Sequence, residues 1–192
     1  MKAFVTGGTG FIGSRVVRRL RERGDEVVAR ERSPEKASEL RELGCELVEG
    51  DLTSEQAIRD GVRGCDAVFH IAAVYKVGIP GSERPAMRDA NVGGTERVLD
   101  AAIEAGVQRI VYVSTVNVFG NTHGAVVDET YTRNGGDFLS CYDETKWQSH
   151  QVALDRIGKG APIVIVQPGG VYGPGDHSEL GKMIDPAATG KL

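Results

Sequence analysis

A glycine-rich turn between an apolar run and an amphipathic stretch constrains this chain more than any other feature. Lys2–Thr6 predicts a strand, the letters TGGTGFIG follow, and Phe11–Arg23 predicts a helix. Gly7, Gly10 and Gly13 permit a tight turn, a close approach of backbone to a pyrophosphate, and close packing of helix on strand, while the helix N-terminus offers N–H groups to an anion. We therefore expect a dinucleotide site formed by Gly7, Gly10, Phe11, Ile12 and Gly13. The alternative is a plain glycine turn.

Short runs rich in valine and isoleucine alternate with longer amphipathic stretches along the rest of the chain. This alternation predicts an α/β fold of the Rossmann type, a doubly wound parallel sheet with crossover helices. The predicted strands are Lys2–Thr6, Glu26–Arg30, Glu46–Glu49, Ala67–Ile71, Arg109–Ser114 and Ile163–Gln167. The predicted helices are Phe11–Arg23, Pro34–Leu43, Ser54–Gly61, Ala90–Ala105 and Tyr142–Ile157. Glycines stand where C-terminal caps belong, at Gly24, Gly44, Gly106 and Gly158.

Two segments depart from this alternation. Residues 120–136 are polar, rich in glycine and too long for an ordinary connection, which favours a loop over an active site. After the last predicted strand, the letters PGGVYGPGDHSEL break the alternation and mark the start of a further segment. We expect residues 1–170 to form the dinucleotide-binding domain, and residues 171–192 to begin a substrate-binding subdomain that is largely absent from this chain.

Composition narrows the class of protein. The chain has 192 residues, a formal net charge of -4 and 40% hydrophobic residues, which indicates one globular domain with a core of ordinary size. Its basic residues are dispersed and outnumbered by acids, so neither nucleic acid nor an anionic membrane is an expected partner. No long apolar run or leader precedes the first strand, which predicts a cytoplasmic protein. Cys45, Cys65 and Cys141 are irregularly spaced, which predicts buried thiols rather than disulfides or a metal site.

The end of the second predicted strand should decide which dinucleotide binds. A carboxylate there can accept hydrogen bonds from the ribose of NAD, whereas an arginine can pair with the extra phosphate of NADP. The chain places one acid, Glu31, among three cations, which are Arg30, Arg32 and Lys36. We expect NADP, with Arg32 as the phosphate ligand. Glu31 keeps NAD open because it follows the glycine turn by about twenty residues, and a solvated strand end is a further alternative.

The ends of the third and fourth predicted strands should line the same site. The letters GDLT place Asp51 and Leu52 at the carboxyl edge of the sheet, near an adenine. Asp51 would accept a hydrogen bond from the adenine amino group, or it would cap the following helix. His70 is expected to be packed or hydrogen-bonded rather than catalytic. Residues after it bring small side chains to the edge, so that a dinucleotide can lie against the backbone of Ile71, Ala72 and Ala73.

Tyr142 and Lys146, in the letters YDETK, lie four residues apart and share one face of a predicted helix. A phenol with an ordinary pKa of about 10 is a poor base, but a nearby ammonium and a nicotinamide cation favour its phenolate form. The lysine can also donate to the ribose hydroxyls, so both residues would touch the cofactor. Ser114 and Thr115 end the fifth predicted strand, where a hydroxyl can hold a substrate oxygen beside Tyr142. Their alternative role is local bonding to the backbone.

A set of short motifs resembles the extended short-chain dehydrogenase/reductase family, which includes nucleotide-sugar epimerases, dehydratases and dihydroflavonol-type reductases. In chain order the motifs are TGGTGFIG, DLT, HIAA, NVGGT, VSTVNVFG, YDETK and PGGVYGPGD, and they span nearly all of the sequence. The resemblance implies that Tyr142 is the general acid/base, with Lys146 as its partner and Thr115 as the catalytic hydroxyl. It implies that Asn91 supports the site, and that residues 168–171, beginning with Pro168, line the nicotinamide side.

Three departures from the family pattern stand out. Thr115 replaces the commoner serine, which keeps a hydroxyl on a stiffer side chain, so activity should survive. Gln167 stands where an arginine usually precedes the proline. The chain is also shorter than family members by roughly a hundred residues or more, and those residues form much of the substrate pocket. The resemblance further implies a homodimer, by analogy.

The residues favour hydride transfer between NADP(H) and a carbonyl or alcohol of a small molecule, as in dihydroflavonol-type reductases. One alternative is a nucleotide-sugar epimerase or dehydratase with tightly bound NAD, for which Glu31 is the best support. Another is a binding module that senses the redox state of NADP without catalysis. A pure sensor has no need for a hydroxyl, a phenol and an ammonium at one site.

Overall fold

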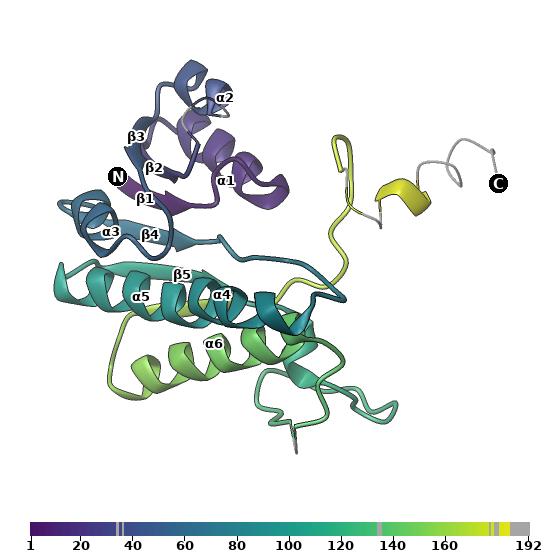
Figure 1. Cartoon of the computed structure of the whole chain (residues 1–192). Helices are drawn as coiled ribbons and strands as arrows, with labels where there is room; N and C mark the ends of the chain where they lie inside the picture. The colour runs from purple at the N-terminus through teal and green to yellow at the C-terminus, as the bar shows by residue number, and fades with distance from the viewer. Residues whose placement is uncertain (34, 36, 134–135, 177, 179–180, 185–192) are drawn as a thin grey trace.

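Six parallel strands form one sheet in the computed structural model (Figure 1), in the order β3-β2-β1-β4-β5-β6. The structure describes residues 1–33, 35, 37–133, 136–176, 178 and 181–184. The strands are β1 (Lys2–Thr6), β2 (Glu26–Glu31), β3 (Glu46–Glu49), β4 (Ala67–His70), β5 (Arg109–Val113) and β6 (Ile163–Val166). This confirms the predicted Rossmann-type fold. The strand order reverses between β1 and β4, and ligands of open α/β sheets bind at such a switch point, beyond the carboxyl ends of the strands.

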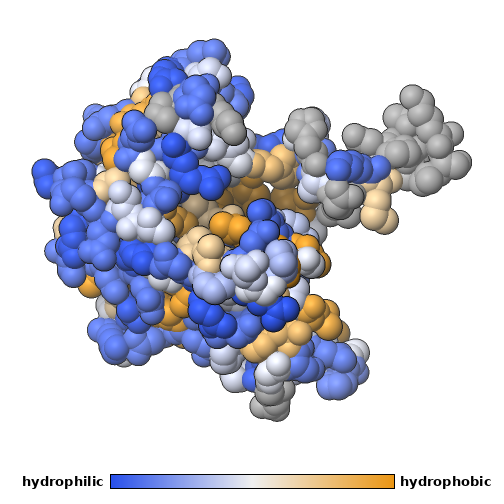
Figure 2. Space-filling model, viewed as in Figure 1, coloured by the Kyte–Doolittle hydropathy of each residue, from blue (hydrophilic) through white to orange (hydrophobic). Residues whose placement is uncertain are grey.

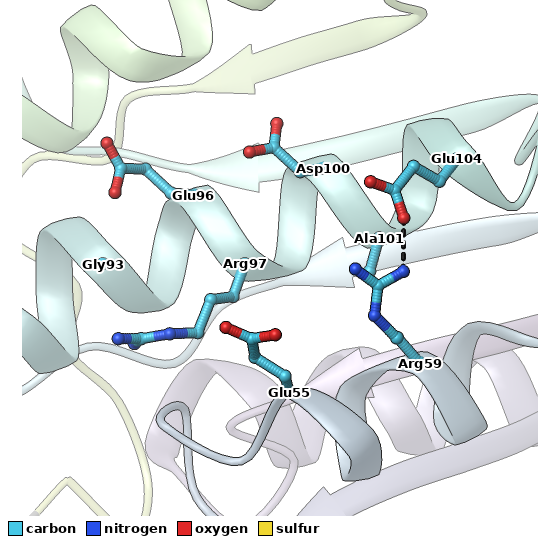
Figure 3. Close-up of a pocket in the computed structure, with 8 residues that line it drawn as sticks. All are labelled: Glu55, Arg59, Gly93, Glu96, Arg97, Asp100, Ala101 and Glu104. Atoms are coloured by element: carbon cyan, nitrogen blue, oxygen red, sulfur yellow. Dashed lines mark hydrogen bonds and ion pairs between the residues drawn. The ribbon is translucent and has the colours of Figure 1, made fainter.

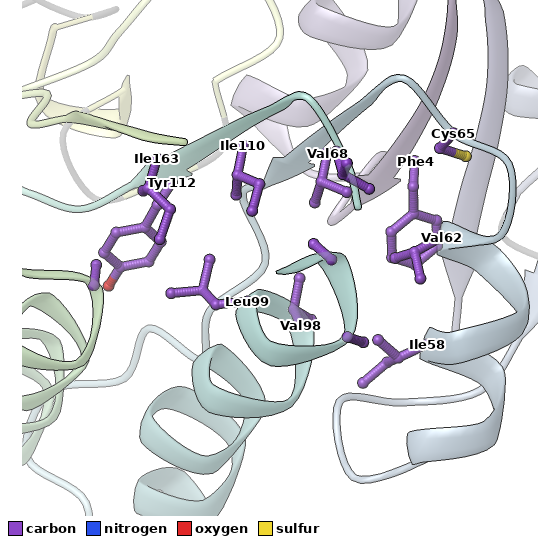
Figure 4. Close-up of a cluster of buried hydrophobic side chains, with 14 of the residues drawn as sticks. Phe4, Ile58, Val62, Cys65, Val68, Val98, Leu99, Ile110, Tyr112 and Ile163 are labelled. Atoms are coloured by element: carbon purple, nitrogen blue, oxygen red, sulfur yellow. The ribbon is translucent and has the colours of Figure 1, made fainter. Parts of the chain in front are cut away.

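Helices cover both faces of the sheet. They are α1 (Phe11–Glu22), α2 (Ser38–Glu42), α3 (Glu55–Val62), α4 (Arg84–Arg88), α5 (Gly94–Glu104) and α6 (Cys141–Gly158). Side chains alternate along each strand, so Phe4 of β1 joins the core under α3, α5 and α6, whereas Ala3 and Val5 join the core under α1 and α2. Figure 4 shows the larger core, in which Val98 and Leu99 of α5 meet residues from β1, β4, β5 and β6.

The helix before β5 begins earlier than its sequence predicts. We expected Ala90–Ala105, but the chain turns helical at Arg84, passes through a π-helical turn over Asp89–Gly93, and continues as α5. Pro85 is tolerated because it lies in the first turn, where its missing N–H would have no helical partner. A π-turn is not visible in apolar spacing because it shifts the helix by one residue.

The end of α6 also differs from expectation. Gly158 is the last residue of the helix rather than its cap, and the left-handed conformation falls on Gly160, with a φ of 91°. The caps expected at Gly24, Gly44 and Gly106 do adopt positive φ.

The segment after β6 leaves the body of the molecule in Figure 1. Its first part packs on α1, where the guanidinium of Arg15 donates to the carbonyl of Pro174 and lies over the Phe11 ring. The predicted second subdomain, residues 171–192, falls partly outside the described residues, so the boundary at residue 170 stays a prediction. No helix within the described ranges combines the length and the apolar character that crossing a bilayer requires.

Candidate active site

A cleft of about 880 Å³ opens at the carboxyl edge of the sheet. In Figure 2, apolar side chains gather in a hollow beside the point where the C-terminal segment leaves the body. The cleft is lined by every residue to which the sequence assigned a cofactor or catalytic role: Gly7, Gly10, Phe11, Ile12, Gly13, Glu31, Arg32, Asp51, Leu52, Ile71, Ala72, Ala73, Thr115, Tyr142, Lys146 and Pro168. Segments far apart in sequence thus meet at one place.

The glycine turn leaves no room for side chains. A Cβ on Gly13 would lie 1.9 Å from the carbonyl oxygen of Gly7, and one on Gly7, which has a φ of 76°, would lie 2.8 Å from the amide nitrogen of Ala72. Gly10 starts α1 without a side-chain cap. Within the described residues, the first-turn N–H groups of Phe11 and Ile12 have no protein acceptor. These residues therefore fit a pyrophosphate.

Glu31 is largely engaged by its own chain. One carboxylate oxygen accepts hydrogen bonds from the backbone N–H groups of Arg32 (2.9 Å) and Ser33 (3.2 Å), and the other accepts from the Thr9 hydroxyl (2.7 Å). Glu31 is buried, whereas Arg32 is exposed at the rim of the cleft. The predicted cation Lys36 lies outside the described residues.

Asp51 holds a turn rather than a helix. Its Oδ1 accepts from the backbone N–H (2.8 Å) and the hydroxyl (2.5 Å) of Thr53, and these bonds lower the pKa of the Asp51 carboxyl. Helix α3 is preceded by Ser54 as its cap residue, so the alternative in which Asp51 caps that helix is wrong. Asp51 and Leu52 do lie at the edge of the cleft.

His70 is a structural residue, as its sequence context indicated. The ring is fully buried between the hydroxyls of Thr6 (Nδ1, 2.8 Å) and Thr95 (Nε2, 3.1 Å). The Thr95 hydroxyl donates to the carbonyl of Asn91 (2.7 Å), so Nε2 must donate to Thr95. Burial lowers the pKa of His70 to about 3, which keeps the ring neutral.

Helix α6 presents Tyr142 and Lys146 to the cleft. The helix starts at this point because the Ser140 hydroxyl accepts from the backbone N–H of Asp143 (3.1 Å) and caps its first turn. Thr115 follows β5, and its hydroxyl accepts from the backbone N–H of Asn117 (3.3 Å), while its own hydrogen has no acceptor among the described residues.

Tyr142 is held as a neutral phenol. Burial raises its pKa to about 12, and Tyr75 and Asp143 add to the shift. The ring of Tyr75 packs edge-on against Tyr142, with centroids 4.7 Å apart. We expected the nearby ammonium of Lys146 to favour the phenolate. The structure shows that this ammonium donates instead to the phenol oxygen of Tyr112 and to the carbonyl of Val113.

Asn91 forms hydrogen bonds both to Val74, in the wall of the cleft, and to α6. Its side chain accepts from the backbone N–H of Val74 (2.7 Å) and donates to the Val74 carbonyl (3.1 Å) and the Thr145 hydroxyl (3.1 Å). The Thr145 hydroxyl in turn donates to the Tyr142 carbonyl (3.1 Å). This geometry supports the site without reaching into it.

Sequence reasoning missed the clamp that fixes the long loop before α6. The buried guanidinium of Arg133 lies 3.3 Å from Asp143, next in sequence to Tyr142, and over the ring of Phe138. Arg133 also packs on Gly120, where an added Cβ would lie 2.9 Å from the guanidinium carbon. The sequence showed only one arginine in a polar segment.

A second depression lies away from this cleft, between α3 and α5 (Figure 3). It has a volume of about 390 Å³ and is lined by charged residues. Its arginines are already paired, Arg59 with Glu104 and Arg97 with Asp89, so the depression presents a solvated helix surface.

Comparison with known proteins agrees with the geometry of the cleft. Residues 3–191 match the model of the NAD dependent epimerase/dehydratase family. The chain belongs to this family. It is an NAD(P)-dependent enzyme family of the extended short-chain dehydrogenase/reductase type, so the resemblance inferred from the motifs is confirmed.

The names of relatives within this family give different reactions. A 4-hydroxy-2-methyl-3-oxo-4-farnesyl-3,4-dihydroquinoline-1-oxide ketoreductase from Stigmatella aurantiaca is 36% identical over 98% of this chain and 56% of its own length. A 2-alkyl-3-oxoalkanoate reductase from Stenotrophomonas maltophilia is 38% identical over 100% of this chain and 57% of its own. The crystal structure of a dTDP-glucose 4,6-dehydratase from Streptomyces venezuelae with NAD bound has a TM-score of 0.83 and 28% identity, over 99% of this chain and 63% of that one. The chain thus spans somewhat over half the length of the curated relatives it matches.

Proposed function

We propose that this chain is the cofactor-binding and catalytic part of an oxidoreductase that transfers hydride between NADP(H) and a carbonyl or alcohol of a small molecule, as dihydroflavonol-type reductases do. The observation that carries the proposal is the presence of Thr115, Tyr142 and Lys146 on the same cleft as the glycine turn. The names of the two curated relatives, a ketoreductase and an oxoalkanoate reductase, favour a carbonyl substrate. A cytoplasmic location and a homodimer stay predictions.

The state of the side chains suits proton donation. With a pKa of about 12, Tyr142 carries its proton at neutral pH and can give it to the oxygen of a carbonyl being reduced. The hydroxyl hydrogen of Thr115 is free to hold that same oxygen. Bound nicotinamide would supply the hydride. The buried ammonium of Lys146 would stabilise the phenolate that proton transfer leaves behind.

The substrate side of the cleft is apolar and aromatic. Tyr75 is 66% exposed, Val116 41% and Val171 39%, although all three line the cleft. Apolar side chains facing water at a cleft favour an apolar ligand over a sugar. We therefore infer a ketone with an apolar body as the substrate.

The decisive experiment mixes the purified protein with NADPH and a panel of apolar ketones and follows NADPH oxidation. Turnover of at least one ketone supports the proposal. A protein that fails to bind NADPH, and fails to oxidise it with every ketone of a broad panel, would contradict the proposal.

The engagement of Glu31 bears on cofactor choice. Because its carboxylate already accepts three hydrogen bonds from Thr9, Arg32 and Ser33, it serves the turn after β2. The exposed side chain of Arg32 lines the cleft without an ion pair in the described part of the chain, so it is available for a phosphate. Both features favour NADP.

We predict that Arg32→Ala raises the Kd of NADPH by roughly tenfold to a hundredfold, because a charge-assisted phosphate contact is lost. The Kd of NADH should stay nearly unchanged. Fluorescence titration of both dinucleotides measures the effect, and Arg63→Ala, on the exposed end of α3, is the control of equal charge. Equal weakening of both dinucleotides, or no change for NADPH, would count against NADP selection by Arg32.

The second candidate is a nucleotide-sugar epimerase or dehydratase with tightly bound NAD. The NAD-bound dehydratase structure and the carboxylate of Glu31 favour it. This function predicts NAD retained through purification, no net cofactor turnover, and a thermal stability raised by a sugar nucleotide.

A further inference from the structure

The ammonium of Lys146 is buried among uncharged groups. The side chain is 3% exposed, and its Nζ donates to the carbonyl of Val113 (2.9 Å) and to the phenol oxygen of Tyr112 (3.3 Å). The same Nζ lies 4.9 Å from the centroid of the Tyr112 ring. Across the residues that the structure describes, no carboxylate pairs with Lys146. Its charge is therefore held by neutral oxygens and a ring face alone.

Tyr112 is itself fixed by packing and hydroxyl groups. It is 1% exposed, and its ring stacks on His70 with centroids 5.7 Å apart. Burial raises the pKa of the Tyr112 phenol, and the hydroxyls of Ser149, Thr95 and Ser114, which face its oxygen, oppose this shift. The Thr95 hydroxyl donates its hydrogen to the carbonyl of Asn91 (2.7 Å), and the Ser149 hydroxyl donates its hydrogen to the carbonyl of Asn91 (2.9 Å) or of Thr145 (2.8 Å). Each can therefore accept the proton of Tyr112, which leaves the phenol oxygen to face the lysine.

We propose that Tyr112 is a positioning residue for Lys146, whose phenol oxygen holds the lysine ammonium at the carboxyl edge of the sheet. The inference rests on the proposed function insofar as Lys146 is catalytic, but the contact belongs to the chain alone. Tyr112 does not line the cleft, so it acts through Lys146 and touches neither cofactor nor substrate.

The contact matters because the lysine is close to losing its charge. Burial lowers the pKa of Lys146 to about 8. The titratable groups around it are Tyr112 on β5, His70 on β4, and Tyr142 and His150 on α6. Burial and then the charge of Lys146 lower the pKa of both histidines, which favours their neutral forms. Removing the Tyr112 hydroxyl should therefore change the pKa of Lys146, because the only other acceptor of its ammonium among the described residues is the carbonyl of Val113.

Tyr112→Phe removes this one oxygen and keeps the ring that packs on His70. Without the acceptor, the protonated form of Lys146 is less stable, so its pKa should fall by about one unit. NMR of lysine labelled at the ε-carbon follows this titration in the protein without cofactor, and the signal is assigned by its absence in Lys146→Met. Tyr131→Phe is the matched control, because it removes a phenol hydroxyl in the long loop, away from Lys146.

A Lys146 titration midpoint that falls in Tyr112→Phe and stays at the parent value in Tyr131→Phe supports the proposal. An unchanged Lys146 midpoint in Tyr112→Phe overturns the proposal, whether or not the variant reduces ketones. In the wild type with NADPH and a ketone, activity should fall as pH rises through the pKa of Lys146, and in Tyr112→Phe this fall should begin about one pH unit lower. Failure of the wild type to turn over any ketone would contradict the proposed function and leave the NMR result standing.

Discussion

Replacing Tyr142 with phenylalanine is expected to lower kcat by about a thousandfold, because the variant lacks the hydroxyl that we propose as the proton donor. The affinity for NADPH should change little. The phenol lines the cleft beside Tyr75, but the phosphates would be held at the opposite end, on the glycine turn. Steady-state rates of ketone reduction and a fluorescence titration with NADPH measure the two quantities separately.

Tyr131→Phe is the matched control, because Tyr131 packs on Phe119 in the long loop and does not line the cleft. It should leave both kcat and NADPH affinity at the parent values. A Tyr142→Phe variant with a kcat within tenfold of the parent would show that another group moves the proton. A binding module without catalysis would lose nothing in either variant.

Gly13→Ala is expected to abolish dinucleotide binding and to lower the free energy of unfolding by about 3 kcal/mol or more. The new Cβ would lie 1.9 Å from the Gly7 carbonyl oxygen and 2.7 Å from its carbon, and both atoms belong to the backbone. The turn must therefore open, which moves the N–H groups of the first turn of α1 away from a common anion. Urea denaturation and isothermal titration with NADPH measure the two losses.

Gly158→Ala provides the comparison. Gly158 ends α6, its φ is not positive, and a Cβ there meets nothing within 4 Å. Alanine in a helix is favoured over glycine by up to about 1 kcal/mol, so this variant should be as stable as the parent or more stable. A Gly13→Ala protein with parental stability and NADPH affinity would mean that the turn is not the tight cradle that the structure shows.

The sequence predicts much of this molecule because its signals are local. All six strands of the sheet lie within one residue of their expected bounds, since each is a short apolar run ended by a turn. The glycine spacing has meaning only between a strand and a helix, and both stand where they were expected. The family motifs then joined distant segments into one site.

The tertiary contacts that position the side chains of the site could not be predicted from local sequence patterns. Tyr112 lies between two valines of β5, so the sequence does not distinguish it from an aromatic residue that only fills the core. The spacing of Tyr142 and Lys146 gave a shared face but not the direction of the ammonium, which turns toward Tyr112. Arg133 finds Asp143 only through the folded path of a long loop. Such contacts depend on tertiary packing rather than on periodicity.

A crystal structure of the protein with NADP tests the central claim most directly. The account predicts that the pyrophosphate lies on the N–H groups at Gly10–Gly13, that the extra phosphate faces Arg32, and that the nicotinamide ring lies beside the Tyr142 phenol. A nicotinamide directed away from Tyr142, or a cleft that stays empty at saturating NADP and NAD, would contradict the account.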